Sequence, residues 1–318
     1  MSQFLNGLVA GISFGGIIAL IALGYVIIYR ATHTLNFAQG ALLTLGAYVA
    51  YWLSGPIEGI KFVNPPSLLR LPLFVAGLIS MVILAGLGWL IERLVVRRFR
   101  GQPVFAVIMA TLGVAIILGQ FMIAVWNTIG VSLDTPFDSQ KPWVDLGPVR
   151  ISQIDLVTLG AVTVITVLFF FVFQRSKLGT AMKATAYDQE AAIAQGISPS
   201  VIFGASWAIS AALAALAGVL LASGAGSNSP QVSPSLAAIA FLGFPAIVLG
   251  GVDSPGGAVL GGLIIGIVWN LFATYDTQVH DVLHLGHDFY QVAPFVLMII
   301  VLLVRPAGLF GTKEVRRV

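Results

Sequence analysis

Residues 19–48 read ALIALGYVIIYRATHTLNFAQGALLTLGAY, two apolar runs separated by a short polar stretch. A helix of about 20 apolar residues crosses roughly 30 Å of hydrocarbon, and both runs continue beyond the quoted ends. The polar stretch, Thr32–Gly40 (THTLNFAQG), places His33, Asn36 and Gln39 between them. This pattern predicts membrane helices that are interrupted by a polar break.

The composition of the whole chain supports the same class. Of 318 residues, 58% are hydrophobic and 9% are charged, and the mean hydropathy is +0.97. Soluble domains carry about 25% charged residues, so a soluble globular enzyme and a disordered chain are both excluded. The chain has no cysteine, which excludes disulfides, thiolate metal sites and cysteine nucleophiles. The net charge of +3 comes from basic residues in short loops, a signal of membrane orientation and not of nucleic-acid binding.

Nine apolar segments follow one another along the chain. We therefore expect an all-α polytopic membrane protein of about nine spans, within a range of eight to ten, with discontinuous or re-entrant helices and a cytoplasmic coupling helix. A single transmembrane domain is expected to cover residues 1–318. The segments are 5–29, 37–53, 72–91, 104–126, 156–173, 201–223, 236–250, 258–274 and 292–304.

Basic residues predict the orientation of these spans. With nine spans, one side of the membrane holds 12 of the 16 Lys and Arg residues, and the positive-inside rule makes that side cytoplasmic. The C-terminus is then cytoplasmic in the plasma (inner) membrane, and the N-terminus lies outside. A second arrangement, with the N-terminus inside and 37–53 re-entrant, stays open. The longest loops are 127–155, outside, and 174–200, inside. The 12 residues are Arg30, Arg93, Arg97, Arg98, Arg100, Arg175, Lys177, Lys183, Arg305, Lys313, Arg316 and Arg317.

Two rows of small residues predict close helix packing. They recur at four-residue spacing, which places each row on one helix face, and small side chains let helix backbones approach in lipid. Static packing and a mobile interface along a passage are both compatible with such rows. The first row is Gly7, Gly11 and Gly15, and the second includes Ser206, Ser210, Ala214, Gly218 and Ala222.

The amides of the polar stretch need hydrogen-bond partners, because unpaired amides are costly in hydrocarbon. Asn36 and Gln39 can both donate and accept, so they could line a passage for a zwitterionic or amide solute. Gly40 would let the backbone approach that solute or turn sharply. A cytoplasmic loop with a helix cap is the other interpretation of the same residues.

Two further polar segments have simpler interpretations. Gly250–Gly257 (GGVDSPGG) is predicted to be a helix break, with Asp253 and Ser254 capping and Pro255 opening the next helix. A proton or cation site at Asp253 is the other interpretation. In the outer loop, His280 and His284 lie four residues apart and His287 follows, next to Asp281 and Asp288. Such a set could hold a metal, but a solvated loop or a docking surface is the expected interpretation, and we assign no metal site.

The inner loop contains a predicted short helix that is too polar to cross the membrane. Residues 177–200 read KLGTAMKATAYDQEAAIAQGISPS, and Gly179–Gln195 is rich in helix formers. Gly196 fits a C-terminal cap, and Ser198 and Pro199 fit the start of the next helix. One short helix between two spans is expected, either docked on a soluble partner or lying on lipid headgroups.

Three blocks of the sequence resemble one transporter family. Glu190, Ala191 and Ala192, followed by Gly196, resemble the EAA-x-x-x-G loop of ABC importer permeases, although the leucine–proline pair downstream is missing. The surrounding KATAYDQEAAIAQGI, the stretch 19–48 and GGVDSPGGAVLGGLIIGI resemble the branched-chain amino acid permeases of the LivH type. The blocks occur in the family order and together span most of the chain.

The resemblance implies partners and residue roles. Such permeases pair with a second permease, usually of the LivM type, and two cytoplasmic P-loop ATPases bind ATP and Mg, so no cofactor is expected in this chain. An extracytoplasmic binding protein delivers the solute. By position, the ATPase-coupling residues would be Ala186 and Glu190–Gly196, including Glu190, Ala191, Ala192 and Gly196. Residues on or near the passage would be Asn36, Phe37, Gln39 and Gly40, where Gln39 replaces the histidine of many relatives.

These observations favour a non-enzymatic permease subunit that moves branched-chain or other neutral amino acids. No G-x-x-x-x-G-K-[ST] phosphate loop occurs in the chain, so ATP hydrolysis would reside in partner chains. A permease for urea or short amides is one alternative, and a stand-alone channel or secondary carrier for small neutral solutes is another. The scarcity of ionisable residues in the spans argues against an ion-coupled carrier.

Overall fold

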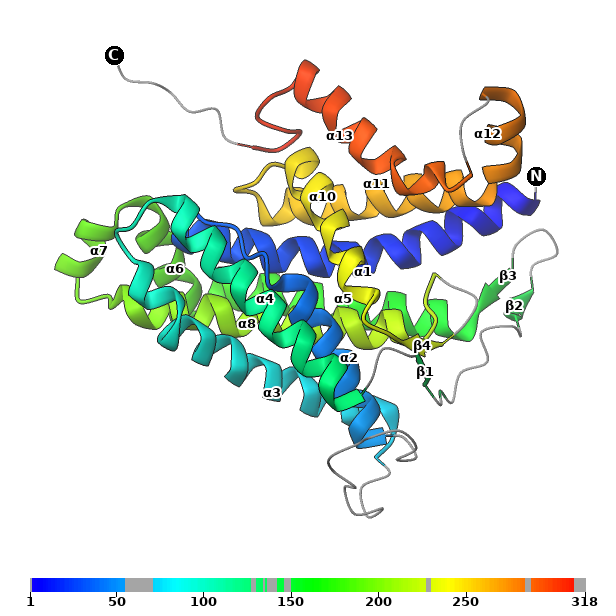
Figure 1. Ribbon diagram of the computed structural model, residues 1–318. Helices are drawn as coiled ribbons and strands as arrows, with labels where there is room; N and C mark the ends of the chain where they lie inside the picture. The colour runs from blue at the N-terminus through cyan, green and yellow to red at the C-terminus, as the bar shows by residue number, and fades with distance from the viewer. Residues whose placement is uncertain are drawn as a thin grey trace.

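The computed structural model describes residues 2–54, 71–126, 130–133, 135, 142–145, 150–226, 230–283 and 287–311. Its helices form one bundle whose long axes run between two ends (Figure 1). At one end lie the short helices α6 (Lys177–Tyr187) and α7 (Gln189–Ala194). At the other end lie the N-terminus and four short strands.

The centre of the bundle is α1 (Ser2–Thr32), whose side chains beyond its first turns are almost all buried. It packs along α11 (Pro255–Thr274) through glycines on both helices. A Cβ on Gly11 would lie 2.9 Å from the Ile267 Cα, and one on Gly15 would lie 2.8 Å from the Leu263 Cα. The two backbones are therefore too close for larger side chains, which is how helices associate in lipid.

Around this centre lie α2 (Gln39–Ser54), α3 (Leu73–Leu94) and α8 (Pro199–Ala222). Two further helices lie on the outside: α4 (Val104–Trp126) packs against α2, and α5 (Gln153–Arg175) packs against α1 and α6. Most residues of α4 and α5 remain uncovered, and their exposed faces carry large apolar side chains such as Ile116, Ile117, Val167 and Phe171. Faces of this kind suit hydrocarbon or another membrane protein.

The C-terminal third is built from shorter elements. A chain of α9 (Leu236–Ile239), η2 (Ala240–Leu242) and α10 (Gly243–Gly250) leads to α11, followed by α12 (Asp276–Leu283), η3 (Phe289–Gln291) and α13 (Ala293–Val304). The predicted break before α11 is present: the Ser254 hydroxyl accepts a hydrogen bond from the Gly257 N–H (3.1 Å), and Pro255 begins the helix.

Short strands occupy the end opposite α6 and α7. Strand β1 (Val131–Ser132) pairs antiparallel with β4 (Gln231–Val232), and β2 (Pro142–Asp145) pairs antiparallel with β3 (Arg150–Ser152). The loop 127–155 thus contains strands that an all-α expectation did not include, although residues 127–129, 134, 136–141 and 146–149 lie outside the described residues. The 3-10 helix η1 (Val96–Phe99) lies at the α6–α7 end.

The helical, polytopic character expected from the sequence is confirmed. Six helices of the described structure are long and apolar enough to cross a membrane: α1, α3 together with η1, α4, α5, α8 and α11. The other three predicted segments correspond to α2, of 16 residues, the stretch Leu236–Gly250, and α13, of 12 residues. Those three are shorter than a full span, so the structure does not establish the count of nine.

Candidate functional site

The break between α1 and α2 is held by hydrogen bonds within the chain. The Asn36 Oδ1 accepts a hydrogen bond from the Ala38 N–H (2.9 Å), closing a local turn of the type that Asn favours. The Asn36 Nδ2 donates to the Gln39 Oε1 (3.1 Å). Both side chains are fully buried, with 0% of their surface exposed. Each amide therefore has a partner, as a buried polar group requires.

Gln39 also fastens this break to α8. The Ser210 hydroxyl donates to the Gln39 Oε1 (3.0 Å), and the Gln39 Nε2 donates to the Ser210 carbonyl (3.5 Å). A Cβ on Gly24 of α1 would collide with the Gln39 amide. We call Asn36, Gln39 and Ser210 the amide cluster; it joins residues 171 positions apart in the sequence.

Phe37 and Gly40 connect the same break to its other neighbours. The Phe37 N–H donates to the Thr111 hydroxyl on α4 (3.3 Å), and the Phe37 ring lies 5.4 Å from the Phe244 ring of α10. A Cβ on Gly40 would collide with the Ala237 carbonyl of α9. The four residues expected near a passage thus surround one break that touches four helices. Their role in a passage stays a prediction.

The loop 174–200 forms two helices where one was predicted. The chain breaks at Asp188, whose φ of −153° is extended and whose carboxylate accepts from the Ala191 N–H (2.9 Å). Asp is a good N-cap because its side chain satisfies a free N–H at the helix start, and this local bond outweighs the helix propensity of the flanking alanines. The prediction of one continuous helix over Gly179–Gln195 was therefore wrong.

Caps fix both ends of the α6–α7 unit. Ser176 accepts from the Gly179 N–H (3.0 Å) at the start of α6. At the end of α7, Gly196 adopts a φ of +80°, and the Ile197 N–H donates to the Ala192 carbonyl (3.0 Å). A left-handed glycine followed by an N–H that bonds back to the last turn of the helix is the expected C-terminal cap. Pro199 begins α8 as expected, but Ser198 makes no side-chain capping bond.

The surface of α6 and α7 places the predicted coupling residues unequally. Glu190, Ala191 and Gly196 are exposed, Ala186 is half-buried, and Ala192 is buried against the bundle. The most exposed large side chain here is Tyr187, 97% exposed, with Ile193 at 53%. Tyr is enriched at protein interfaces, so this exposed ring is a candidate contact residue. Sequence reasoning missed both residues because helix periodicity alone does not show which face is free.

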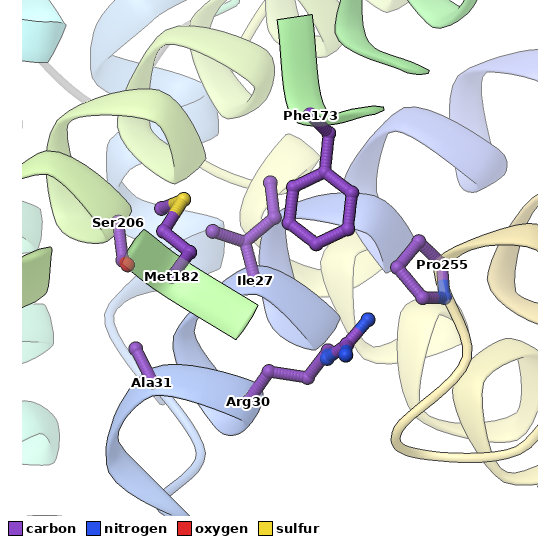
Figure 2. Close-up of a pocket in the computed structure, with 7 residues that line it drawn as sticks. All are labelled: Ile27, Arg30, Ala31, Phe173, Met182, Ser206 and Pro255. Carbon is purple, nitrogen blue, oxygen red and sulfur yellow. The ribbon is translucent and has the colours of Figure 1, made fainter. Parts of the chain in front are cut away.

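The α6 helix sits on a small cavity that four other helices also line. Figure 2 shows the seven residues that line the cavity: Ile27, Arg30 and Ala31 from α1, Phe173 from α5, Met182 from α6, Ser206 from α8 and Pro255 from α11. Its volume is about 10 Å³, room for about one water molecule. The Arg30 guanidinium and the Lys183 ammonium lie 5.4 Å and 5.0 Å from the Phe173 ring centroid, within cation–π range. The Arg30 contact joins α1 to α5, and the Lys183 contact holds α6 on α5.

The two rows of small residues face different helices. Gly7, Gly11 and Gly15 lie against α11, whereas on α8 a Cβ at Gly218 would collide with the Leu43 carbonyl of α2. Ala214 is fully buried in the same row. Ser210 does more than pack, because its hydroxyl serves Gln39.

The outer-loop histidines show no metal arrangement among the residues described. The His280 and His287 rings stack at 4.1 Å, and the His287 Nδ1 lies 3.2 Å from an Asp276 carboxylate oxygen. The described part of the chain contains no group of three or more His, Asp or Glu placed to hold a metal ion. His284 lies outside it.

A bundle of apolar helices with a central broken helix pair and a capped helical unit at one end defines a multi-pass membrane protein. A family model described as the branched-chain amino acid transport system permease component matches residues 7–302. The chain belongs to this family.

Relatives of known designation agree over nearly the full length. The chain is 32% identical to the high-affinity branched-chain amino acid transport system permease protein LivH of Salmonella typhimurium, covering 99% of this chain and 98% of that protein. It is 31% identical to the corresponding BraD protein of Pseudomonas aeruginosa, with the same coverage. A probable LivH permease of Methanocaldococcus jannaschii is 27% identical over 96% of this chain and 93% of its own length.

Proposed function

We propose that this permease is the translocating subunit of an ATP-driven ABC importer for branched-chain or other neutral amino acids. In this proposal an extracytoplasmic binding protein delivers the solute, a second LivM-type permease completes the passage, and two cytoplasmic ATPases supply the energy. The observation that carries the proposal is the α6–α7 unit, joined to α8 by a short capped turn.

A unit of this kind can transmit force only if it is rigid and attached. Ser176, Asp188 and Gly196 fix its helix ends, and the contact between Lys183 of α6 and the Phe173 ring of α5 holds α6 on the bundle. A channel or a secondary carrier has no need for such an element. Its exposed residues, Tyr187, Glu190 and Ile193, supply the surface on which an ATPase would dock.

The amide cluster supports a neutral, hydrogen-bonding solute. Asn36, Gln39 and Ser210 are hydrogen-bonded to one another, and all three groups are uncharged. These hydrogen bonds can be exchanged for bonds to the ammonium and carboxylate of an amino acid. The nearby rings of Phe37 and Phe244 offer an apolar surface for its side chain. Alternating access would then follow from ATP-dependent changes in the relative stability of two arrangements of this break.

The orientation follows from the basic residues. The end of the bundle that holds α6 and α7 carries five basic residues. Arg30 lies beside Met182 of α6, Arg175 ends α5 just before α6, and Lys183 belongs to α6. Arg97 and Arg100 contact Ser200, at the start of α8. By the positive-inside rule this end faces the cytoplasm, where the ATPases are, and the C-terminus is cytoplasmic. The strands at the opposite end face the binding protein, and the uncovered faces of α4 and α5 meet lipid and the second permease.

The test is reconstitution of the permease with its genomic neighbours in proteoliposomes. We expect leucine uptake that requires ATP, the binding protein and both ATPases. Glu190→Lys and Gly196→Trp are expected to abolish solute-stimulated ATPase activity while the permease still inserts, and Gln102→Leu, at an exposed position between α3 and α4, serves as the control. Uptake that continues without ATPases would identify a channel or carrier. Uptake of urea in preference to leucine would replace the amino acid with a short amide.

A further inference from the structure

Glu92 is a fully buried carboxylate close to the end of α3. Its side chain has 0% of its surface exposed, and it lies two residues before the helix ends at Leu94. A buried ionised carboxylate costs several kcal/mol unless it is paired and hydrogen-bonded. The C-terminus of a helix also carries partial negative charge, which disfavours a carboxylate there. Helix stability therefore does not explain this residue.

Two arginines that follow α3 neutralise it. The Arg97 Nη2 lies 2.8 Å from one Glu92 carboxylate oxygen, and Arg100 forms an ion pair with the other. Both oxygens thus have a guanidinium partner. Arg97 contacts both of them, because its Nε also donates to the Glu92 Oε1 (3.4 Å), and such two-point pairs are the strong ones. We call Glu92, Arg97 and Arg100 the ionic cluster.

The same arginines reach the first turn of α8. The Arg100 Nη1 donates to the Ser200 hydroxyl (2.8 Å), and the Arg97 Nη2 donates to the Ser200 carbonyl (3.4 Å). The Arg100 guanidinium also lies 4.6 Å from the Phe203 ring centroid. Gly204 of α8 lets this helix lie close to Trp89 and Glu92 of α3. A Cβ on Gly204 would lie 2.7 Å from the Trp89 ring and 3.6 Å from a Glu92 oxygen.

Ser200 stands four residues after Gly196, the cap that ends the α6–α7 unit. Any movement of that unit therefore reaches α8 at the point where the ionic cluster holds it. Along α8, Ser210 lies ten residues further, about 15 Å at 1.5 Å per residue, and contacts Gln39. One rigid helix thus joins the ionic cluster to the amide cluster.

We propose that the ionic cluster clamps the start of α8 to α3, so that displacement of α6 and α7 moves the two helices together. Without the clamp the connection Gly196–Pro199 would bend and absorb the displacement. Glu92, Arg97 and Arg100 are then positioning residues for energy coupling. The inference rests on the proposed function, because it presumes that the α6–α7 unit receives the force.

The first test is Glu92→Gln, which keeps the shape and removes the charge, in the fully reconstituted transporter. We expect leucine taken up per ATP hydrolysed to fall about fivefold or more, a typical loss of coupling, while ATPases still co-purify. Arg100→Lys, which keeps the charge but loses the planar fork and the ring contact, should show a smaller loss in the same direction. Arg98→Gln, on an exposed arginine of the same segment, should leave the ratio unchanged. A wild-type ratio in both Glu92→Gln and Arg100→Lys would overturn the clamp.

A distance measurement separates this inference from the proposed function. The chain has no native cysteine, so spin labels can be attached to cysteines placed at the exposed positions Leu90 and Val201. We expect one narrow distance distribution in the Arg98→Gln protein and a broad one after Glu92→Gln, with or without ATPases present. Equal widths in the two variants would refute the clamp even if ATP-driven uptake is observed. A broadened distribution without any ATP dependence of uptake would retain the clamp and reject the importer.

Discussion

The two polar clusters that hold α8 differ in kind. The ionic cluster at Ser200 uses a carboxylate and two arginines, and the arginine side chains are 35% and 30% exposed, so their charges keep contact with water. The amide cluster at Ser210 uses only neutral groups, and its amides are fully buried. A charged side chain costs little free energy at the edge of the membrane and much more at its centre. We therefore expect the ionic contacts at Ser200 to persist while the transporter works, and the neutral hydrogen bonds at Ser210, ten residues further, to exchange partners.

Both clusters need α8 to pack tightly against α2 further along the helix, at Gly218. Gly218→Leu should cause the largest effect of the changes considered, because the side chain would meet the Leu43 backbone, which cannot move aside. We expect destabilisation of at least about 1–3 kcal/mol and a loss of folded protein in detergent. Gly86→Leu is the matched control, since a Cβ there meets nothing within 4 Å. Equal thermal unfolding midpoints for the two variants would contradict this packing.

The amide cluster can be broken without adding volume. Gln39→Leu leaves Asn36 and Ser210 with one partner fewer in a buried place, at about 1–3 kcal/mol. We expect leucine uptake to drop by an order of magnitude or more, with basal ATPase activity retained, and a similar drop for Asn36→Leu. Normal uptake kinetics in both variants would remove these residues from the passage.

The two clusters hold α8 in place, whereas the exposed surface of α6 and α7 is expected to bind the ATPase that moves it. Tyr187→Ala should weaken ATPase binding to the permease in nanodiscs by about 2 kcal/mol, the size of an interface anchor, because its exposed ring is removed. Tyr187→Phe keeps the ring and should bind nearly as well. If alanine and phenylalanine give the same affinity, Tyr187 is not an anchor, and the docking surface must centre on Glu190 or Ile193.

The smallest expected effect concerns the link from the break to α4. Thr111→Val removes the acceptor of the Phe37 N–H at a cost of about 1 kcal/mol, whereas Thr111→Ser retains the hydroxyl. We expect a slightly lower unfolding midpoint and a modest decrease in uptake for valine, with serine close to the wild type. A valine variant as stable and active as the serine variant would show that this bond contributes nothing.

Much of the architecture could be predicted from local sequence because its signals are local. Apolar runs gave the helices, Ser254 and Pro255 gave the start of α11, and Gly196 gave the end of α7. The break at Asp188 was missed, since a capping side chain competes with helix propensity in a way that composition does not resolve.

The partnerships between distant residues could not be predicted from one sequence. Gln39 and Ser210 are 171 positions apart, and Arg100 and Ser200 are 100 apart, so no spacing rule connects them. Glu92 gave a weak signal, a lone acid ahead of a run of arginines, but only the fold shows that its carboxylate is buried. The roles of Asn36, Phe37, Gln39 and Gly40 in a passage remain predictions.

In the proposed mechanism, α8 transmits movement from the ionic cluster to the amide cluster. A double-mutant cycle of Glu92→Gln and Ser210→Ala, measured as ATP-driven leucine uptake in proteoliposomes, tests it most directly. Two sites about 15 Å apart normally act additively within about 0.3–0.5 kcal/mol. We expect an interaction energy well above that, because the second substitution adds little once α8 no longer couples the two clusters. Additive effects of the two substitutions would contradict it.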